Sequence, residues 1–496
     1  MILKILVLCI SLCAIYYLVR LYNEIYWRKR GVKFYKKYGV FGPLGEYLTT
    51  DRPLFDIIYD IYKAHPDEPA VGFGALFTKA LYVKDPVNVQ HVLNQDFNSF
   101  NHRGVEMNEE DHLANNILFM MGDRWKLMRQ TMTPLFTSAK LKNMFYIIDR
   151  SAQDLVDYLK KNPGKMKDDV LNTLCTFSCA ATGAAVFGIG SDSIFKSPFL
   201  PMAMKVLKPT LKRNMKIVLC TVNTFLYKLL GLTLFKDYEE FFITVIKQVI
   251  RKREEENVKK HDYADLCVNL KRKGLLKDPD TGFELQLTDE LLAAQAFVFF
   301  IAGVEPTAAS MFSTLVNLGL HPEILKRAQE EIDNTFERCN SISFDTIQEL
   351  EYLDMVHCES MRIYPSIGYL SRQCTNDTVL PVGNIKVDKG TLIFTPIFEY
   401  HHDPNIYPDP EVFNPERFSS ENRTNISDYT YMPFGRGKRL CIGTRYASLQ
   451  VKTVLFYLLR NFSVRTHVLG SGIKYSKQNV QVRASNLRIE FIPRDS

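Results

Sequence analysis

Several features that would assign a function class are missing from this 496-residue sequence. Its ten cysteines include no Cys-x-x-Cys pair, which argues against a disulfide framework or a zinc-binding fold. Lysine and arginine are scattered among 55 acidic residues and give a net charge of only +7, so nucleic-acid binding is not favoured. After about residue 45 there is no repeat, low-complexity tract or Ser/Gly-rich linker. These absences favour one large catalytic body in a reducing compartment.

The amino terminus is predicted to be an uncleaved membrane anchor. Residues 5–19 carry no charge, although a full membrane span needs about 20 apolar residues. No small-residue cleavage site follows, and the basic residues after the apolar run place the rest of the chain on the cytosolic side. We therefore expect an anchor at residues 1–27, a basic linker or hinge at 28–45 and a catalytic domain at 46–496. A buried amphipathic helix is the alternative for the first segment.

Helical patterns dominate the rest of the chain. Thr288 is a helix-capping residue followed by two acids, and the apolar run after it predicts a buried central helix over 287–320. The segment 401–434 is rich in Pro, Asp and Asn and is expected to be a long ordered meander. Strand-like pieces are few and short, and they occupy residues 80–83, 382–387, 391–394 and 487–491.

The most specific segment runs from Pro433 to Gly443 and reads Pro-Phe-Gly-Arg-Gly-Lys-Arg-Leu-Cys-Ile-Gly. Glycines permit tight turns, so this loop can hold Cys441 at the start of the helical run 444–459. Backbone amides and the helix dipole stabilise a thiolate at such a position. A small buried core cysteine is the alternative, but it leaves the glycines and Arg439 without a joint purpose.

This segment resembles the haem-binding loop of the cytochrome P450 superfamily, F-x-x-G-x-R-x-C-x-G, at every fixed position. The resemblance implies a mainly α fold with small β-sheets, the cytochrome P450 fold, preceded by an N-terminal transmembrane helix. It implies haem b (heme b, iron protoporphyrin IX) as the cofactor and Cys441 as its axial metal ligand, which favours O–O cleavage. It also implies that Phe434 packs near the sulfur, that Arg439 pairs with a haem propionate and that Gly443 belongs to the cofactor-binding loop.

Two further sets of residues resemble motifs of the same family. Glu359 and Arg362 lie three apart, and Arg417 follows some fifty residues later, as in the buried Glu-Arg-Arg arrangement that holds the meander beneath the haem. The resemblance makes these three residues structural rather than catalytic. A second set, Trp125, Arg129 and Arg372, resembles propionate-binding residues. An exposed arginine or a core tryptophan is the alternative at each of those positions.

Residues 302–307 resemble the oxygen-activation segment of the family with one departure. Ala302 and Glu305 keep the usual small residue and acid, whereas Pro306 replaces the usual threonine, and Thr307 is displaced by one residue. Proline inside a helix frees the carbonyl four residues back, here that of Ala302. We hypothesise that this carbonyl, with Glu305 and Thr307, holds the water that relays protons.

Other segments resemble insect microsomal members that oxidise plant toxins and insecticides. The resemblance implies a monooxygenase of the endoplasmic reticulum membrane. It implies electrons from NADPH, delivered by the FAD/FMN-containing NADPH-cytochrome P450 reductase, with cytochrome b5 as a further donor. A small lipophilic substrate is expected against residues 104–118, 199–218, Phe297, Phe300, Ala302, 367–370 and 478–482. A haem-thiolate isomerase or dehydratase that needs no external electrons is the alternative, followed by a noncatalytic haem or lipid binder.

Overall fold

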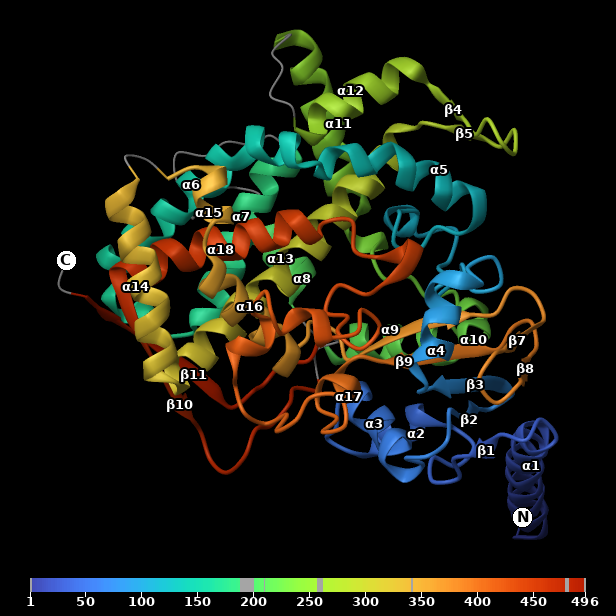
Figure 1. Ribbon diagram of the computed structural model, residues 1–496. Helices are drawn as coiled ribbons and strands as arrows, with labels where there is room; N and C mark the ends of the chain where they lie inside the picture. Colours follow the sequence, from blue (N-terminus) through green and yellow to red (C-terminus); the bar gives the residue numbers. More distant parts are fainter. Residues whose placement is uncertain are drawn as a thin grey trace.

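The computed structural model describes residues 2–187, 200–208, 210–256, 262–339, 342–477 and 481–494. Helices form most of the molecule and small sheets lie at its edges, so the predicted mainly α fold with small β-sheets is confirmed (Figure 1). The central helix α13 (Asp289–Leu320) begins where the sequence predicts. The Thr288 hydroxyl accepts a hydrogen bond from the Leu291 amide, and two acids occupy the first turn.

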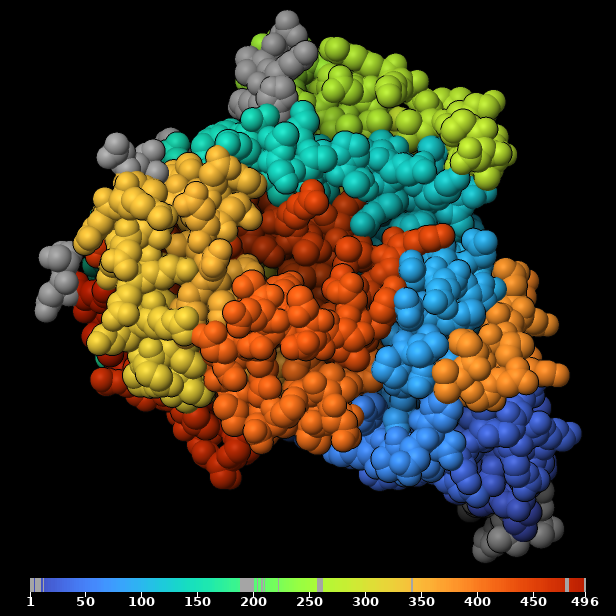
Figure 2. Space-filling model, viewed as in Figure 1, coloured from blue at the N-terminus to red at the C-terminus, as the bar shows by residue number. Residues whose placement is uncertain are grey.

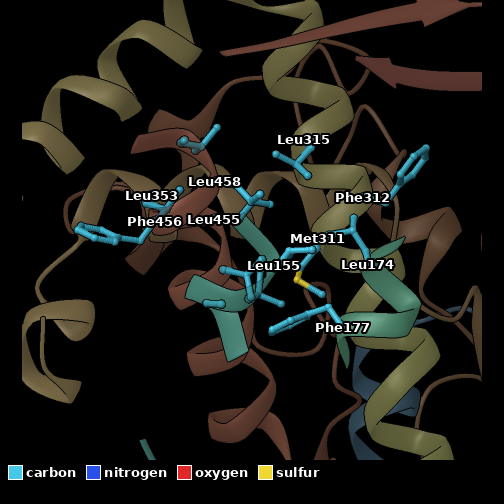
Figure 3. Close-up of a cluster of buried hydrophobic side chains, with 14 of the residues drawn as sticks. Leu155, Leu174, Phe177, Met311, Phe312, Leu315, Leu353, Leu455, Phe456 and Leu458 are labelled. Carbon is cyan, nitrogen blue, oxygen red and sulfur yellow. The ribbon is translucent and has the colours of Figure 1, made fainter. Parts of the chain in front are cut away.

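Helices α7 (Val170–Phe187), α16 (Glu351–Ile363) and α18 (Thr444–Asn461) pack against α13, and α6 (Ser138–Lys161) packs in turn against α7 and α18. Figure 3 shows how Met311 and Leu315 of α13 meet Leu155, Phe177 and Leu455 from three of these helices. All five side chains are almost fully buried. This close-packed cluster fixes α13 and α18 relative to one another, and both helices carry residues of the candidate site.

Helices α7 and α13 are long and apolar enough to cross a membrane by length and composition alone. However, 72% of the apolar window of α7 and 67% of that of α13 are buried inside the protein. A helix that is apolar on all sides can be buried in a protein core as well as in a membrane. Because most of each window is buried inside the protein, we assign both helices to the core.

The largest sheet has five strands in the order β1 (Lys33–Phe34), β2 (Ala70–Ala75), β3 (Thr78–Val83), β9 (Leu392–Pro396) and β6 (Tyr369–Gln373). Arg372 of β6 pairs in register with Ile393 of β9. The smaller sheets are the two-stranded pairs β10 (Phe462–Val468) with β11 (Leu487–Pro493), β4 (Leu275–Lys277) with β5 (Glu284–Gln286), and β7 (Thr378–Leu380) with β8 (Ile385–Val387).

The predicted strands at 80–83, 391–394 and 487–491 fall within or overlap β3, β9 and β11. The strand predicted at 382–387 is only half right, because Gly383 has a φ of 84° and the chain turns before β8. The remaining helices are α2 (Pro43–Thr49), α3 (Leu54–Ala64), α4 (Pro86–Gln90), α5 (Gly122–Met132), α8 (Leu200–Leu207), α9 (Leu211–Val222), α10 (Thr224–Leu229), α11 (Glu239–Glu256), α12 (Tyr263–Lys273), α14 (Pro322–Arg338), α15 (Phe344–Gln348) and α17 (Phe398–His401).

The last turns of helix α1 (Ile2–Arg28) pack into the large sheet, whereas its amino-terminal end projects away from the body (Figure 1). The Trp27 side chain is fully buried, and its Nε1 donates a hydrogen bond to the Phe73 carbonyl at 3.3 Å. A Cβ atom on Gly72 would lie 2.3 Å from Trp27 Cγ, so only glycine leaves room for the indole. Asn23 Nδ2 donates to the Leu76 carbonyl at 2.8 Å. The end of α1 is therefore wedged into strand β2 and the turn that follows it.

The expected meander at 401–434 contains only short 3₁₀ turns, at Pro415–Phe418 and Arg423–Asn425. In Figure 2 this orange segment covers the centre of the visible face, beside the yellow α14. It leads directly into the loop that carries Cys441.

Candidate active site

One cavity of about 520 Å³ brings together most of the residues that the sequence singles out. Its wall includes Ala302 and Thr307 of α13 and, from the loop before α18, Phe434 and Cys441. Cys441 is exposed, and the cavity is the space that it faces. The cavity is therefore the candidate active site.

The loop before α18 holds Cys441 through its backbone. The Cys441 amide donates a hydrogen bond to the Phe434 carbonyl at 3.0 Å, which closes the loop. Gly437 has a φ of 73°, and a Cβ atom there would lie 1.9 Å from the Leu93 carbonyl oxygen. Any larger residue would push the loop away from that backbone. Gly443 is the N-cap of α18 and does not line the cavity, so the sulfur lies just before the positive end of a helix.

Five arginines line the same cavity as the sulfur, and four of them, Arg103, Arg129, Arg372 and Arg439, lie close enough to one another for their charges to interact. The Arg439 guanidinium lies 4.0 Å above the Trp125 ring, and its Nη2 donates to the carbonyls of Asn101 at 2.9 Å and Met120 at 2.8 Å. These contacts hold the guanidinium in place, but the carbonyls are neutral. Trp125 is itself 7% exposed and lines the cavity.

The four charges lack a counterion in the part of the chain that the structure describes, where none of the four forms an ion pair with a carboxylate. Burial, together with the neighbouring Arg103, Arg372 and Arg129, lowers the pKa of Arg439 to about 8. Burial also lowers the pKa of Arg103 to about 10, and burial with the adjacent Arg103 charge lowers that of Arg372 to about 9. Arg103 Nε and Arg372 Nε are buried without a hydrogen-bond partner. Such a cluster fits a cofactor that carries two carboxylates beside a sulfur-bound metal, as the propionates of haem would provide.

Sequence reasoning gave Arg103 no role in the cluster. Its side chain is partly buried against the loop, and Nη2 donates to the Arg439 carbonyl at 3.2 Å. The position of Arg103 between an aromatic residue and a glycine, Phe100 and Gly104, is compatible with a buried side chain but does not require one. Phe100 is fully buried, and a Cβ atom on Gly104 would lie 3.1 Å from Leu392.

The structure brings Glu359, Arg362 and Arg417 together beneath the site. Arg362 Nε and Nη2 donate to the two Glu359 carboxylate oxygens at 2.8 and 2.9 Å, and both side chains are fully buried. Arg417 Nε lies 3.5 Å from Glu359 Oε1. Arg362 also donates to the carbonyls of His401 at 2.6 Å and Pro410 at 2.7 Å, which ties α16 to the meander. None of the three lines the cavity, so their contacts fit a structural role.

Helix α13 presents Ala302, Glu305, Pro306 and Thr307 to the cavity. Pro306 lies inside the helix and has no amide hydrogen to donate to the Ala302 carbonyl. Glu305 lies close to Cys175 of α7, whose pKa is raised to about 12 by burial and, in second place, by the Glu305 charge. Ser310, one turn beyond Pro306, also lines the cavity, and its Oγ is buried with no hydrogen-bond partner among the described residues. Sequence reasoning did not single out Ser310, although its spacing of four residues from Pro306 places both on one helix face.

The expected substrate contacts are partly wrong on α13. Phe297 and Phe300 are fully buried and pack against Phe242 of α11, whereas the cavity wall is formed by Val298 and Phe299. The sequence of a helix that is apolar on every face does not show which face lines a cavity, and this explains the error. Other expected contacts that line the cavity are Val105, Met107, Ile117, Leu118, Val206, Arg213, Ile217, Ile367, Leu370 and Gln481. Phe199 and residues 478–480 lie outside the described residues.

Comparison with known proteins agrees with this geometry. A family model described as Cytochrome P450 matches residues 36–491. The chain is 33% identical to Cytochrome P450 6k1 of Blattella germanica, over 91% of this chain and 88% of that protein. It is 32% identical to Probable cytochrome P450 6d4 of Drosophila melanogaster, over 95% and 96% of the two chains. It is 29% identical to Cytochrome P450 6B7 of Helicoverpa armigera, over 98% of each.

Proposed function

The chain belongs to the cytochrome P450 family and is therefore a haem monooxygenase with haem b as its cofactor, and we propose that it oxidises small lipophilic xenobiotics such as plant toxins or insecticides. We further propose that NADPH-cytochrome P450 reductase supplies the electrons through its FAD and FMN, with cytochrome b5 as a further donor. The observation that carries the proposal is that Cys441 shares one cavity with four neighbouring arginines, none of which pairs with a carboxylate of the described residues.

In this proposal different residues of the cavity bind the metal, bind the propionates and orient the substrate. Cys441 would bind the metal, Phe434 would shield the sulfur, and Arg103, Arg129, Arg372, Arg439 and Trp125 would hold the two propionates. When bound, haem supplies the activation of O2. The apolar residues of the wall would exclude water and orient a lipophilic substrate.

Proton supply is assigned to α13. The Ala302 carbonyl is freed by Pro306, and we propose that it holds a water molecule together with Glu305 and Thr307. A carbonyl can accept a hydrogen bond from that water but cannot pass on a proton, so Glu305 would be the exchanging group.

We place the catalytic body on the cytosolic side of the endoplasmic reticulum membrane, with α1 as the anchor. The reductase would dock near the Cys441 loop, where Lys126, Arg436 and Lys438 are cationic. Two of these three already have acidic neighbours. Lys126 Nζ lies 3.1 Å from Asp278 and 3.0 Å from Asp280, and Arg436 pairs with Asp428. We therefore expect docking to exchange local ion pairs for intermolecular ones.

A reduced carbon monoxide difference spectrum tests the proposal. Wild-type protein should show the red-shifted Soret band of a sulfur ligand, and Cys441→Ala should lose that band while Cys339→Ala, which changes another incompletely buried cysteine, keeps it. A Cys441→Ala protein with an unchanged spectrum, or a wild-type protein that never retains haem, would refute the assignment.

Pro306 favours one second candidate, a haem-thiolate isomerase or dehydratase, because such reactions need no proton delivery to O2. Turnover that requires NADPH and reductase supports the monooxygenase, whereas turnover without either supports the alternative. A type I binding screen of lipophilic compounds would supply the substrate for both assays.

A further inference from the structure

Buried polar side chains lie next to α13 but outside the wall of the cavity. Helix α7 contributes Ser178 and Thr182, and helix α18 contributes Tyr446 and Gln450. The two residues of each pair are one helical turn apart and therefore share a helix face. Each of the four is at most 8% exposed, and none lines the cavity. We call these four residues the α7–α18 polar group.

The side-chain polar atoms of this group have no hydrogen-bond partner among the described residues. They are the hydroxyls of Ser178, Thr182 and Tyr446 and both Nε2 and Oε1 of the Gln450 amide. Their surroundings are apolar, since Phe177, the neighbour of Ser178 in the chain, belongs to the core cluster of Figure 3. A buried hydroxyl or amide without a partner costs free energy, and proteins commonly satisfy such groups with ordered water.

Thr182 brings the α7–α18 polar group to the backbone of α13 at Gly303. A Cβ atom on Gly303 would lie 3.1 Å from Thr182 Cγ2 and 3.5 Å from Thr182 Oγ1. The Tyr446 hydroxyl lies beside that of Thr182, and this proximity opposes the rise in the pKa of Tyr446 to about 12 that burial causes. Gln450 lies one turn beyond Tyr446. The contacts therefore lead from α18 to the residue after Ala302, whose carbonyl lacks its usual donor.

From this arrangement we propose that the α7–α18 polar group binds ordered water next to α13, and that this water supplies the relay water at the Ala302 carbonyl. The role in proton supply rests on the proposed function, whereas the water site does not. The group offers hydrogen-bond donors and acceptors but no charge, which fits water rather than an ion. A buried water makes about three hydrogen bonds, so several of these side chains can share one molecule. The four residues are positioning residues, since they act through the water that they bind.

A crystal structure of the full-length, haem-loaded protein tests the water site, at a resolution that shows ordered water. Water should lie within hydrogen-bond distance of the Gln450 amide and of the Tyr446 hydroxyl. Tyr446→Phe keeps the ring and removes only the hydroxyl, so its structure should lose at least one of these water molecules. A wild-type structure in which the Gln450 amide bonds only to protein atoms would overturn the water site, whatever reaction the enzyme catalyses.

Thr182→Val tests the link to proton supply, because it keeps the methyl group beside Gly303 and removes the hydroxyl. The product formed per NADPH should fall by about 3- to 10-fold, as expected for the loss of one hydrogen bond, and peroxide release should rise. The fall should be larger in D2O than in H2O, which altered packing alone does not predict. Thr453→Val is the matched control, since this buried threonine of α18 already donates to the Leu449 carbonyl at 2.7 Å, and its ratio should equal that of the wild type.

Three results would overturn the link to proton supply. The first is an unchanged ratio in Thr182→Val. The second is a fall of the same size in D2O and H2O. The third is an equal fall in Thr453→Val, which would indicate a general loss of packing. The carbon monoxide spectrum is recorded on each preparation. A wild-type protein without the band of a sulfur ligand refutes the proposed function, and this result is separate from a failure of the α7–α18 polar group.

Discussion

Pro306 changes the chemistry of α13 at a single backbone position. It removes one amide hydrogen, so the carbonyl of Ala302, a residue of the cavity wall, lacks its usual donor. The Thr307 hydroxyl is buried one residue further on, about 100° round the helix. We propose that this change affects proton supply rather than substrate binding.

We expect Pro306→Ala to lower the product formed per NADPH by about 10-fold and to raise peroxide release, because the restored helix bond withdraws the carbonyl from the relay water. Pro306→Thr adds a hydroxyl at the same position and should give a higher ratio than the alanine variant. Product, NADPH and peroxide are measured together. Equal ratios in all three proteins would contradict a role for this position.

Glu399, at the second residue of α17, is fully buried beside the Tyr82 hydroxyl, and no basic side chain forms an ion pair with it among the described residues. Burial raises its pKa to about 8, so the folded protein holds a proton that the unfolded chain has already released at neutral pH. Because the folded state binds the extra proton, the contribution of Glu399 to stability declines as pH rises from the ordinary carboxyl range to about 8, and levels off above that.

Glu399→Gln stays neutral and should therefore stabilise the protein increasingly between about pH 5 and pH 8. The measured quantity is the unfolding midpoint of the variant minus that of the wild type at each pH. Glu421→Gln, at an exposed position, should give a difference close to zero throughout. A Glu399→Gln difference that does not change with pH would show that the carboxyl is ionised in the folded protein.

At the scale of elements, the contact between α1 and strand β2 depends on Gly72, which has no side chain. Trp27 occupies the space that a Cβ atom on Gly72 would need. The sequence revealed the apolar run of α1 but not this contact, because nothing in local periodicity indicates which distant glycine will face a tryptophan. The length and start of α13 were predictable for the opposite reason, since capping and apolar patterning are local.

Trp27→Ala should cost about 3–5 kcal/mol of unfolding free energy, as other large-to-small substitutions in a core do. Gly72→Ala should also destabilise, and the double variant should be less destabilised than the sum of the two, because the space left by Trp27 receives the new methyl group. Chemical denaturation checks all three. Tyr17→Ala in the exposed part of α1 is the control and should have little effect, since its side chain is 64% exposed. If the changes in unfolding free energy of the two single variants add up to that of the double variant, the side chains at positions 27 and 72 do not compete for the same space.

At the scale of the whole molecule, Arg362 joins segments that lie far apart in the sequence. It bonds to Glu359 in its own helix and to carbonyls at positions 401 and 410 of the meander, which ends at the Cys441 loop. The pattern of Glu359 and Arg362 was visible in the sequence only through its family resemblance. An isolated pair three residues apart is usually an exposed ion pair of small energy.

Arg362→Lys should destabilise the protein by about 3–5 kcal/mol and lower the haem bound per polypeptide, because lysine cannot replace the paired donors and leaves Glu359 buried with incomplete pairing. Haem content and unfolding midpoint are measured on the same preparation. Arg338→Lys changes an exposed arginine that pairs with Glu349 at 3.1 Å, and it should alter neither quantity. Full haem content in Arg362→Lys would show that the network does not support the cofactor loop.

The guanidinium groups of Arg103, Arg129, Arg372 and Arg439 repel one another across the interior of the newly made chain. This repulsion opposes folding of the cavity wall until a ligand with two negative charges binds. Folding of the wall should therefore depend on the binding of haem, whose two propionates would balance these charges. We therefore expect the protein without haem to be less stable than the protein with haem bound.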